Sequence, residues 1–297
     1  MRVYATNIVV IVLMTSLTCA ADKLDESEAI EKIESLGGKV TRDDTLPSRP
    51  VTEINLLGSK DITDDHLRLV VRIPTLIALN LDHCSLTDDK MAALQGLKNL
   101  RTLSLCHTGV SDASMGVVGE LTKLTTLRLE ATPVTDSGLM RLSGLKNLTT
   151  LNLRMTRITD EGLIQLKNFP KLKTLNISNT LISNNGMREI GQIKTLDKLW
   201  IGENKISTDG FRELQQLTNL TTLGIGATEV MDDDLKELKA FPRLTWLRLS
   251  LTHVTDAGVQ ELKELKGLTF LNIEDTAISD EAVTELKSAL PKLKVQR

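Results

Sequence analysis

Residues 148–163, Leu-Thr-Thr-Leu-Asn-Leu-Arg-Met-Thr-Arg-Ile-Thr-Asp-Glu-Gly-Leu, decide the fold, because the pattern of apolar residues changes halfway through them. Residues 151–153 alternate apolar and polar side chains, as in a short strand that buries every second residue. Leu163, Leu166 and Phe169 then recur at a spacing of three, which predicts a helix on the opposite side. One such unit cannot bury its own apolar side, so neighbouring copies must cover it.

Copies of this unit follow one another along most of the chain. The phrase Leu-x-x-Leu-x-Leu, with Ile last in four copies, begins every 24 residues at Leu76, Leu100, Leu124, Leu148, Leu172, Leu196, Leu220, Leu244 and Leu268. An earlier copy at residues 51–56 and a truncated one at residues 293–295 lie one residue out of register. The chain has only 2% aromatic residues, so stacked Leu and Ile must supply the core. Each fully buried Leu or Ile side chain contributes roughly 1.5–3 kcal/mol to the stability of the fold.

A Thr-Asp or Ser-Asp pair precedes the predicted helix of most units. The pairs stand at residues 63–64, 87–88, 111–112, 135–136, 159–160, 255–256 and 279–280. Either side-chain oxygen can accept a hydrogen bond from the first N–H groups of the helix, and a carboxylate suits the positive helix end. We therefore interpret these acidic residues as helix caps and not as a catalytic array.

Three of these pairs extend to Thr-Asp-x-Gly-Leu or Thr-Asp-x-Gly-Val, at residues 135–139, 159–163 and 255–259. Together with the leucine phrases, this element resembles the cysteine-containing variant of the leucine-rich-repeat family, over residues 51–297. The resemblance implies an α/β solenoid, or horseshoe, of about ten 24-residue repeats with N- and C-terminal caps. It places parallel strands on the concave face and helices on the convex face.

One column departs from the family pattern, in which many members have Asn or Cys. It contains Cys84, Thr108, Thr132, Thr156, Thr180, Asn204, Thr228, Thr252 and Thr276. Because a threonine hydroxyl can bond the adjacent backbone, we expect a ladder of hydroxyls in place of a ladder of amides.

The N-terminal residues predict a secretory signal peptide at residues 1–20. Arg2 precedes an apolar run at residues 8–14, which is too short to cross a ~30 Å hydrocarbon core, and small residues follow. Lipidation of Cys19 and an uncleaved, buried helix are the alternatives. We expect an N-terminal cap at residues 21–50, one repeat domain at residues 51–297, and an extracytoplasmic (periplasmic or secreted) location without membrane contact after signal removal.

The N-terminal cap is expected to begin with a helix from Asp25 to Leu36, ended by Gly37 and Gly38. A segment from Val40 then crosses to the first strand. This arrangement resembles the caps of exported bacterial proteins that carry the same repeat variant.

Both tryptophans fall on outward positions of the predicted strands. Trp246 and Phe270 are one strand apart, about 5 Å, and Gly224 and Gly226 leave a flat gap beside Trp200. Tryptophan and arginine are enriched at binding hot spots. We therefore predict a partner-binding surface formed by Trp200, Trp246, Phe270, Arg248, Arg128 and Arg154. The alternative is that the indoles lie flat and only shield the strand backbone.

A second cluster contains His83, His107, Cys84 and Cys106, and the two histidines are register-equivalent in neighbouring repeats. A zinc site needs three or four converging ligands, and Cys84 occupies the inward column. We therefore expect two exposed histidines and a packed thiol, with no metal or other cofactor. An enzyme with a metal at His83, His107 and Cys106 is the alternative.

Charge and motifs limit the function. A net charge of −3 argues against a nucleic-acid surface, and the sequence contains no His-Glu-x-x-His, Gly-x-Ser-x-Gly or Walker motif. We predict a non-enzymatic, exported scaffold that docks a protein or an extended ligand on its concave face. A substrate-recognition subunit similar to ubiquitin-ligase leucine-rich-repeat adaptors is the alternative, although no F-box-like module precedes the repeats.

Overall fold

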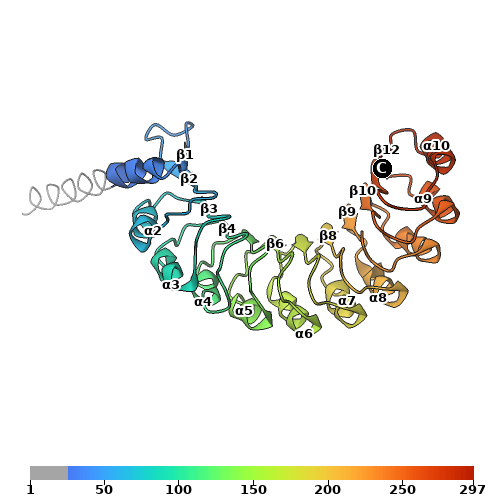
Figure 1. The fold of residues 1–297 in the computed structure, drawn as a ribbon, viewed down its shortest axis with the longest axis horizontal. Coiled ribbons are helices and arrows are strands. Elements are labelled where there is room, and N and C mark those ends of the chain that lie inside the picture. Colours follow the sequence, from blue (N-terminus) through green and yellow to red (C-terminus); the bar gives the residue numbers. More distant parts are fainter. Residues whose placement is uncertain (1–25) are drawn as a thin grey trace, which may run out of the picture.

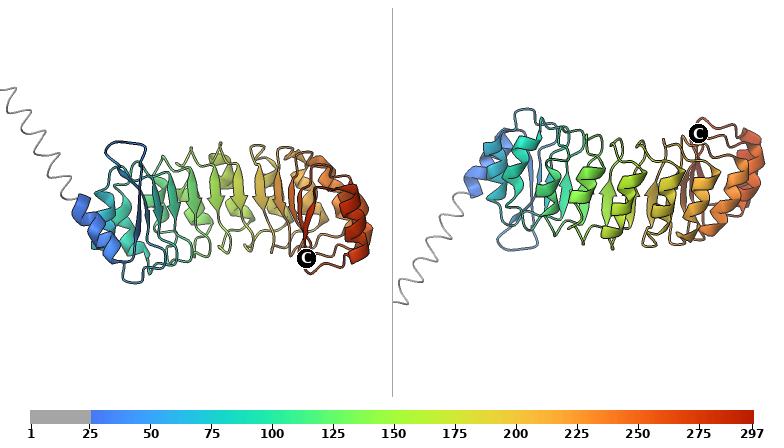
Figure 2. Two further views of the ribbon diagram at one scale, coloured as in Figure 1. Left: turned by 90° about the horizontal axis from the view of Figure 1, so that it is seen from above. Right: turned by 90° about the horizontal axis from the view of Figure 1, so that it is seen from below.

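A computed structural model describes residues 26–297 as an open arc (Figure 1). Strands line the inner side of the arc and helices the outer side, which confirms the predicted solenoid. Figure 2 shows the strands from above and the helices from below. The predicted signal peptide and Asp25 lie outside the described residues.

Within residues 26–297 the strands form one twelve-stranded sheet in sequence order. They are β1 (Lys39–Arg42), β2 (Val51–Asn55), β3 (Ala78–Asn80), β4 (Thr102–Ser104), β5 (Thr126–Arg128), β6 (Thr150–Asn152), β7 (Thr174–Asn176), β8 (Lys198–Trp200), β9 (Thr222–Gly224), β10 (Trp246–Arg248), β11 (Phe270–Asn272) and β12 (Lys294–Gln296). From β2 onward neighbouring strands are parallel, and the 24-residue period sets their register: Leu79 pairs with Leu103, and Leu103 with Leu127.

The N-terminal end contains a strand that the sequence did not predict. A helix over residues 26–35 ends before Gly37, whose φ of +79° favours glycine. Lys39–Arg42 then pairs antiparallel with β2, where a crossing segment was expected. This pairing satisfies the open edge of β2, which would otherwise expose a row of backbone donors and acceptors.

Short helical segments return the chain along the convex side. They are α2 (Asp64–Val71), α3 (Asp88–Met91), η1 (Ala92–Leu94), α4 (Met115–Gly119), α5 (Asp136–Arg141), α6 (Asp160–Leu163), η2 (Ile164–Asn168), α7 (Asn184–Gly191), α8 (Thr208–Arg212), η3 (Glu213–Gln216), η4 (Asp232–Ala240), η5 (Asp256–Gly258), α9 (Val259–Lys263) and α10 (Asp280–Ala289). Between them and the sheet, one continuous core runs from Ile30 to Leu293, built mainly of buried Leu and Ile.

The threonine column closes turns, and among its threonines Thr180 alone also bonds the next repeat, through Asn204 Oδ1. Thr132 Oγ1 donates to the carbonyl of Leu129 in its own repeat, at 2.6 Å, and the other threonines of the column repeat this bond. The expected bond to adjacent backbone is therefore confirmed, but the ladder is wrong. Asn204 does connect repeats, because its longer amide reaches the carbonyl of Ile177, at 2.8 Å, as well as its own turn.

The aspartates of the Thr-Asp pairs have a different role from the predicted one. Thr135 caps its own helix by accepting from the N–H of Ser137, as expected. Asp112, from the preceding repeat, accepts from Thr135 N (2.8 Å) and Thr135 Oγ1 (2.6 Å). Equivalent pairs of bonds join Asp136 to Thr159, Asp160 to Ser183 and Asp232 to Thr255. The carboxylates thus bind neighbouring repeats together.

This ladder explains the glycine of the Thr-Asp-x-Gly element. A Cβ placed on Gly138 would overlap with the Asp112 carboxylate of the preceding repeat, and one on Gly258 would overlap with Asp232. One repeat differs, because its carboxylate stands at the glycine position itself. This residue is Asp234, whose Oδ2 accepts from Met231 N at 2.9 Å. The shorter Thr208 of the preceding repeat stands where that ladder normally has a carboxylate.

Candidate functional site

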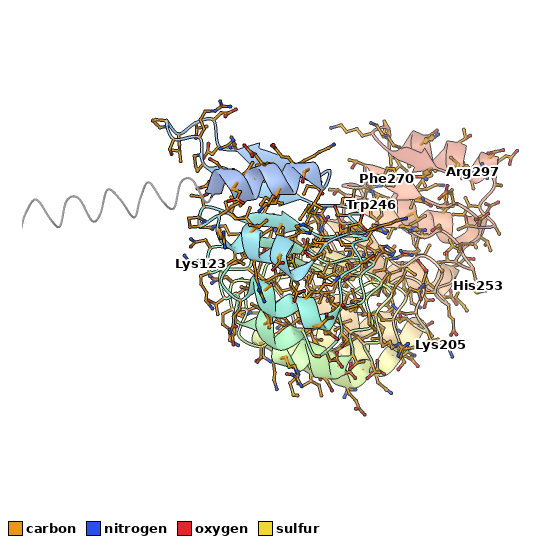
Figure 3. All side chains as sticks on the ribbon, turned by 60° about the vertical axis from the view of Figure 1, so that its left-hand side comes forward. Lys123, Lys205, Trp246, His253, Phe270 and Arg297 are labelled. Atoms are coloured by element: carbon orange, nitrogen blue, oxygen red, sulfur yellow. The ribbon has the colours of Figure 1, made fainter. Side chains whose placement is uncertain are left out.

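The stacked rings of Trp246 and Phe270 mark the C-terminal part of the concave face. Their centroids are 5.4 Å apart and their planes differ by 4°, which confirms the predicted contact. Strand register places them in one line, here named the aromatic row: Lys198, Thr222, Trp246, Phe270 and Lys294. Figure 3 shows both rings on the inner side of the arc, whereas Lys205 and His253 lie toward its outer edge.

Trp200 extends this aromatic surface toward β8. Its ring contacts Trp246 in an edge-to-face arrangement, with centroids 6.4 Å apart and planes at 62°. The indole leans over Gly224, where a Cβ would overlap with the Trp200 ring. The prediction of a flat gap at Gly224 is therefore wrong, because the indole covers this position. Trp200 shields the backbone there but stays half-buried, so part of it faces solvent.

A hollow of about 400 Å³ lies beside Trp200, here named the concave hollow. It is lined by Arg154, Asn176, Ser178, Trp200, Gly202, Glu203, Gly224, Gly226 and Arg248. Gly226 lines this hollow, and no side chain fits at that position because a Cβ would meet Ser250 Oγ at 2.7 Å and Arg248 Nε at 3.3 Å. Arg248 lies back across this glycine, and its Nε donates to Ser250 Oγ at 2.7 Å.

Arg154 borders the same hollow, and each of its two Nη atoms binds a carboxylate. It pairs with Glu130 Oε1 at 3.0 Å and with Glu203 Oε1 at 3.0 Å. Partial burial works to lower the pKa of Arg154, but the bonds to Glu203 and Glu130 prevail and raise that pKa above its ordinary value. Arg154 therefore acts as a fixed wall of the hollow.

The two glutamates that hold Arg154 were missed by the sequence reasoning. Glu130 could have been found, because it stands one 24-residue step before Arg154 in the same row. Glu203 lies two repeats away and at a residue with φ of 58°, so no register rule pairs it with Arg154.

Arg128 is not brought together with the other predicted residues. It is exposed on β5, three strands before β8, which is roughly 14 Å at the usual strand spacing. The concave hollow does not include it. The structure thus groups Trp200, Trp246, Phe270 and Arg248, adds Arg154, and leaves Arg128 outside.

The histidine and cysteine cluster has the expected layout. The exposed rings of His83 and His107 stack with centroids 4.3 Å apart and planes 9° apart. Cys84 is buried, and its Sγ donates to the Leu56 carbonyl at 3.0 Å. Burial raises the pKa of both the Cys84 and the Cys106 thiols. No three His, Cys, Asp or Glu side chains within residues 26–297 are arranged to hold a metal ion.

Comparison with known proteins agrees with this architecture. A family model described as a leucine-rich repeat matches residues 144–167, which is one unit of the solenoid. A search of curated proteins found no match. No helix in the described part of the chain combines the length and apolarity needed to span a membrane.

Solved structures with a similar fold include two internalins of Listeria monocytogenes. The first is 21% identical, with a TM-score of 0.53, and the match covers 82% of this chain and 86% of the internalin. The second, internalin C2, is 21% identical, with a TM-score of 0.50, and the match covers 75% of this chain and 80% of that one. At this identity the likeness concerns the fold alone. Together with the 24-residue register of the sheet, the comparisons show that the chain has the fold of leucine-rich-repeat proteins.

Proposed function

We propose that this chain is a non-enzymatic, exported scaffold that docks a protein partner on the concave face between β8 and β11. The observation that carries the proposal is the position of the only two tryptophans, Trp200 and Trp246, half-buried beside Phe270 on an otherwise polar sheet. Partly exposed aromatic side chains next to an arginine are the groups that most often dominate binding energy in protein interfaces.

The hollow beside these rings supports the same proposal. Its glycine lining and fixed Arg154 wall form a preorganised depression next to apolar rings, which lowers the entropy lost on binding. The curved sheet provides a long concave surface, as solenoids use for binding partners.

A pull-down from the extracytoplasmic fraction of the producing organism tests the docking surface. The double variant Trp200→Ala and Trp246→Ala should lose the captured partner while its circular dichroism spectrum stays that of the wild type. The matched control is Met140→Ala with Ile164→Ala, which removes two exposed apolar side chains from the convex side. Equal capture by the tryptophan variant and the wild type would refute the docking surface.

The export part of the proposal rests on the predicted signal peptide. Mass spectrometry of the mature protein should find an N-terminus at Ala21 or Asp22, after cleavage behind Ala20 or Ala21. A mature protein that still begins at Met1 would contradict export and favour the intracellular adaptor.

A further inference from the structure

We infer that the concave hollow and the aromatic row bind an acidic, extended segment of the partner polypeptide. This inference rests on the proposed function and adds the chemistry of the partner. Its basis is an imbalance on the concave face between β8 and β12: the glutamates are bonded within the protein, whereas the Nζ atoms of two lysines and the Nη atoms of one arginine around the rings are not.

The glutamates of this region are occupied, whereas Asp275 is exposed beside Glu274. Glu130 and Glu203 both bind Arg154, and Glu203 also accepts from Asn179 Nδ2 at 3.0 Å. Glu274 accepts from Asn272 Nδ2 at 2.9 Å, and bonds of this kind hold the pKa of Glu274 below its ordinary value. These carboxylates therefore have little capacity left to attract a cationic ligand.

The basic side chains differ. Among residues 26–297, no hydrogen-bond or ion-pair partner binds the Nζ atoms of Lys198 and Lys294 or the two Nη atoms of Arg248, and all three residues are exposed. The charge of Arg248 helps to lower the pKa of Glu274, but the two form no salt bridge. Because Nε of Arg248 is fixed on Ser250, the outer edge of its planar guanidinium is oriented for a carboxylate.

The three cations enclose the aromatic rings. Lys198 and Lys294 are the two ends of the aromatic row, and Arg248 lies two residues beyond Trp246 on the same strand. The row crosses four strand spacings, about 19 Å at about 4.8 Å each. An extended chain covers this length in about six residue steps, with every second side chain facing the sheet. A ligand with an apolar ring between carboxylates therefore fits both the charges and the rings.

The same features favour a polypeptide over a nucleic acid. The chain as a whole carries a net charge of −3, which repels a polyanion outside this local region. In addition, Trp246 and Phe270 use one face of each ring for their mutual stack, which leaves no gap between them for a base. Discrete carboxylates on an extended chain match three separated cations better than a continuous phosphate backbone does.

Intrinsic tryptophan fluorescence provides a specific readout, because both tryptophans of the chain belong to this site. The probe is the synthetic peptide acetyl-Glu-Ser-Phe-Ser-Glu-Ser-Glu-amide, titrated into the full mature chain. The controls are the same peptide with Lys in place of each Glu, the same peptide with Ala in place of Phe, and a single-stranded oligothymidylate. We expect saturable binding of the acidic peptide, weaker binding without the Phe, weaker binding at high salt, and no binding of the lysine peptide or the oligonucleotide.

Single charge removals then locate the contact. Arg248→Gln should weaken peptide binding about tenfold, and Lys198→Gln or Lys294→Gln about threefold to fivefold, as expected for the loss of a charge-assisted bond. The matched control is Lys236→Gln, an exposed lysine on the convex segment η4, and should leave binding unchanged. No fluorescence change up to millimolar peptide, equal binding of the lysine peptide, preferred binding of the oligonucleotide, or equal affinity of the Arg248 variant and the Lys236 control would each overturn the inference.

The pull-down separates this inference from the proposed function. If the tryptophan variant loses the partner but Arg248→Gln combined with Lys198→Gln captures it as the wild type does, the docking surface stands and the acidic chemistry is wrong. If none of these variants affects capture, both are wrong. Loss of capture in the tryptophan variant and in the cation variant supports both.

Discussion

Replacing Gly162 with alanine tests the aspartate ladder between repeats. Gly162 lies in α6, and a Cβ added there would lie 3.2 Å from Asp136 Cβ and overlap with the rest of that carboxylate. Asp136 itself accepts from Thr159 N at 2.9 Å and Thr159 Oγ1 at 2.6 Å. Because Gly162 is part of the α6 backbone, the carboxylate has to move and both bonds are lost.

The expected cost follows from these two bonds. A hydrogen bond to a charged group contributes about 1.5–3 kcal/mol, and the half-buried position of Asp136 favours the lower end, so the pair is worth about 3 kcal/mol. Alanine recovers about 0.5–1 kcal/mol by restricting the unfolded chain and favouring helix. We therefore expect Gly162→Ala to lower the free energy of unfolding by about 2–3 kcal/mol.

Urea denaturation, followed by circular dichroism and by tryptophan fluorescence, measures this change. Gly116→Ala in α4 is the matched control, because no atom lies within 4 Å of the added Cβ, and it should be neutral or slightly stabilising. Asp136→Ala should cost a similar 2–3 kcal/mol. The double variant with Gly162→Ala should cost no more than Asp136→Ala alone, since the collision is gone. Wild-type stability of Gly162→Ala, or strict additivity in the double variant, would refute the reasoning.

Three further predictions concern single side chains. Partial burial works to raise the pKa of Asp88, but bonds from two serines of the next repeat hold that pKa below its ordinary value. The ionised Asp88 therefore stabilises the fold above pH of about 4, and this contribution is lost as pH falls through the folded pKa. Asp88→Asn, which mimics the native Asn184, should therefore cost about 1–2 kcal/mol at neutral pH and progressively less in acid, measured by urea denaturation across pH; a constant difference would contradict this. Ala131 has a φ of 53°, in the left-handed region that favours glycine. Ala131→Gly should therefore raise the free energy of unfolding by up to about 1 kcal/mol in the same assay, and a decrease would argue against backbone strain there. Cys84 and Cys106, buried with raised pKa values, should react with a thiol reagent far more slowly in the folded protein than in urea, and equal rates would disprove their burial.

Much of the candidate site could be predicted because the repeat translates sequence position into spatial position. Each 24-residue step adds one parallel strand in the same register, so Trp246 and Phe270 had to be neighbours, and His83 had to meet His107. The same rule separates Arg128 from the rings, because it lies five strands before Trp246. Its inclusion in the predicted surface ignored this count.

The period alone thus determined the solenoid, its parallel register and the rows of its concave face, since stacking identical units is the way such short segments bury their leucines. Tertiary structure decided where the longer side chains turn. The Asp112 carboxylate reaches forward to Thr135 instead of capping its own helix, Trp200 leans over Gly224, and Arg154 reaches Glu203 two repeats away. These side-chain orientations depend on which partners and which empty spaces lie within reach of each side chain in the curved stack. The repeat pattern of the sequence does not contain those distances between side chains.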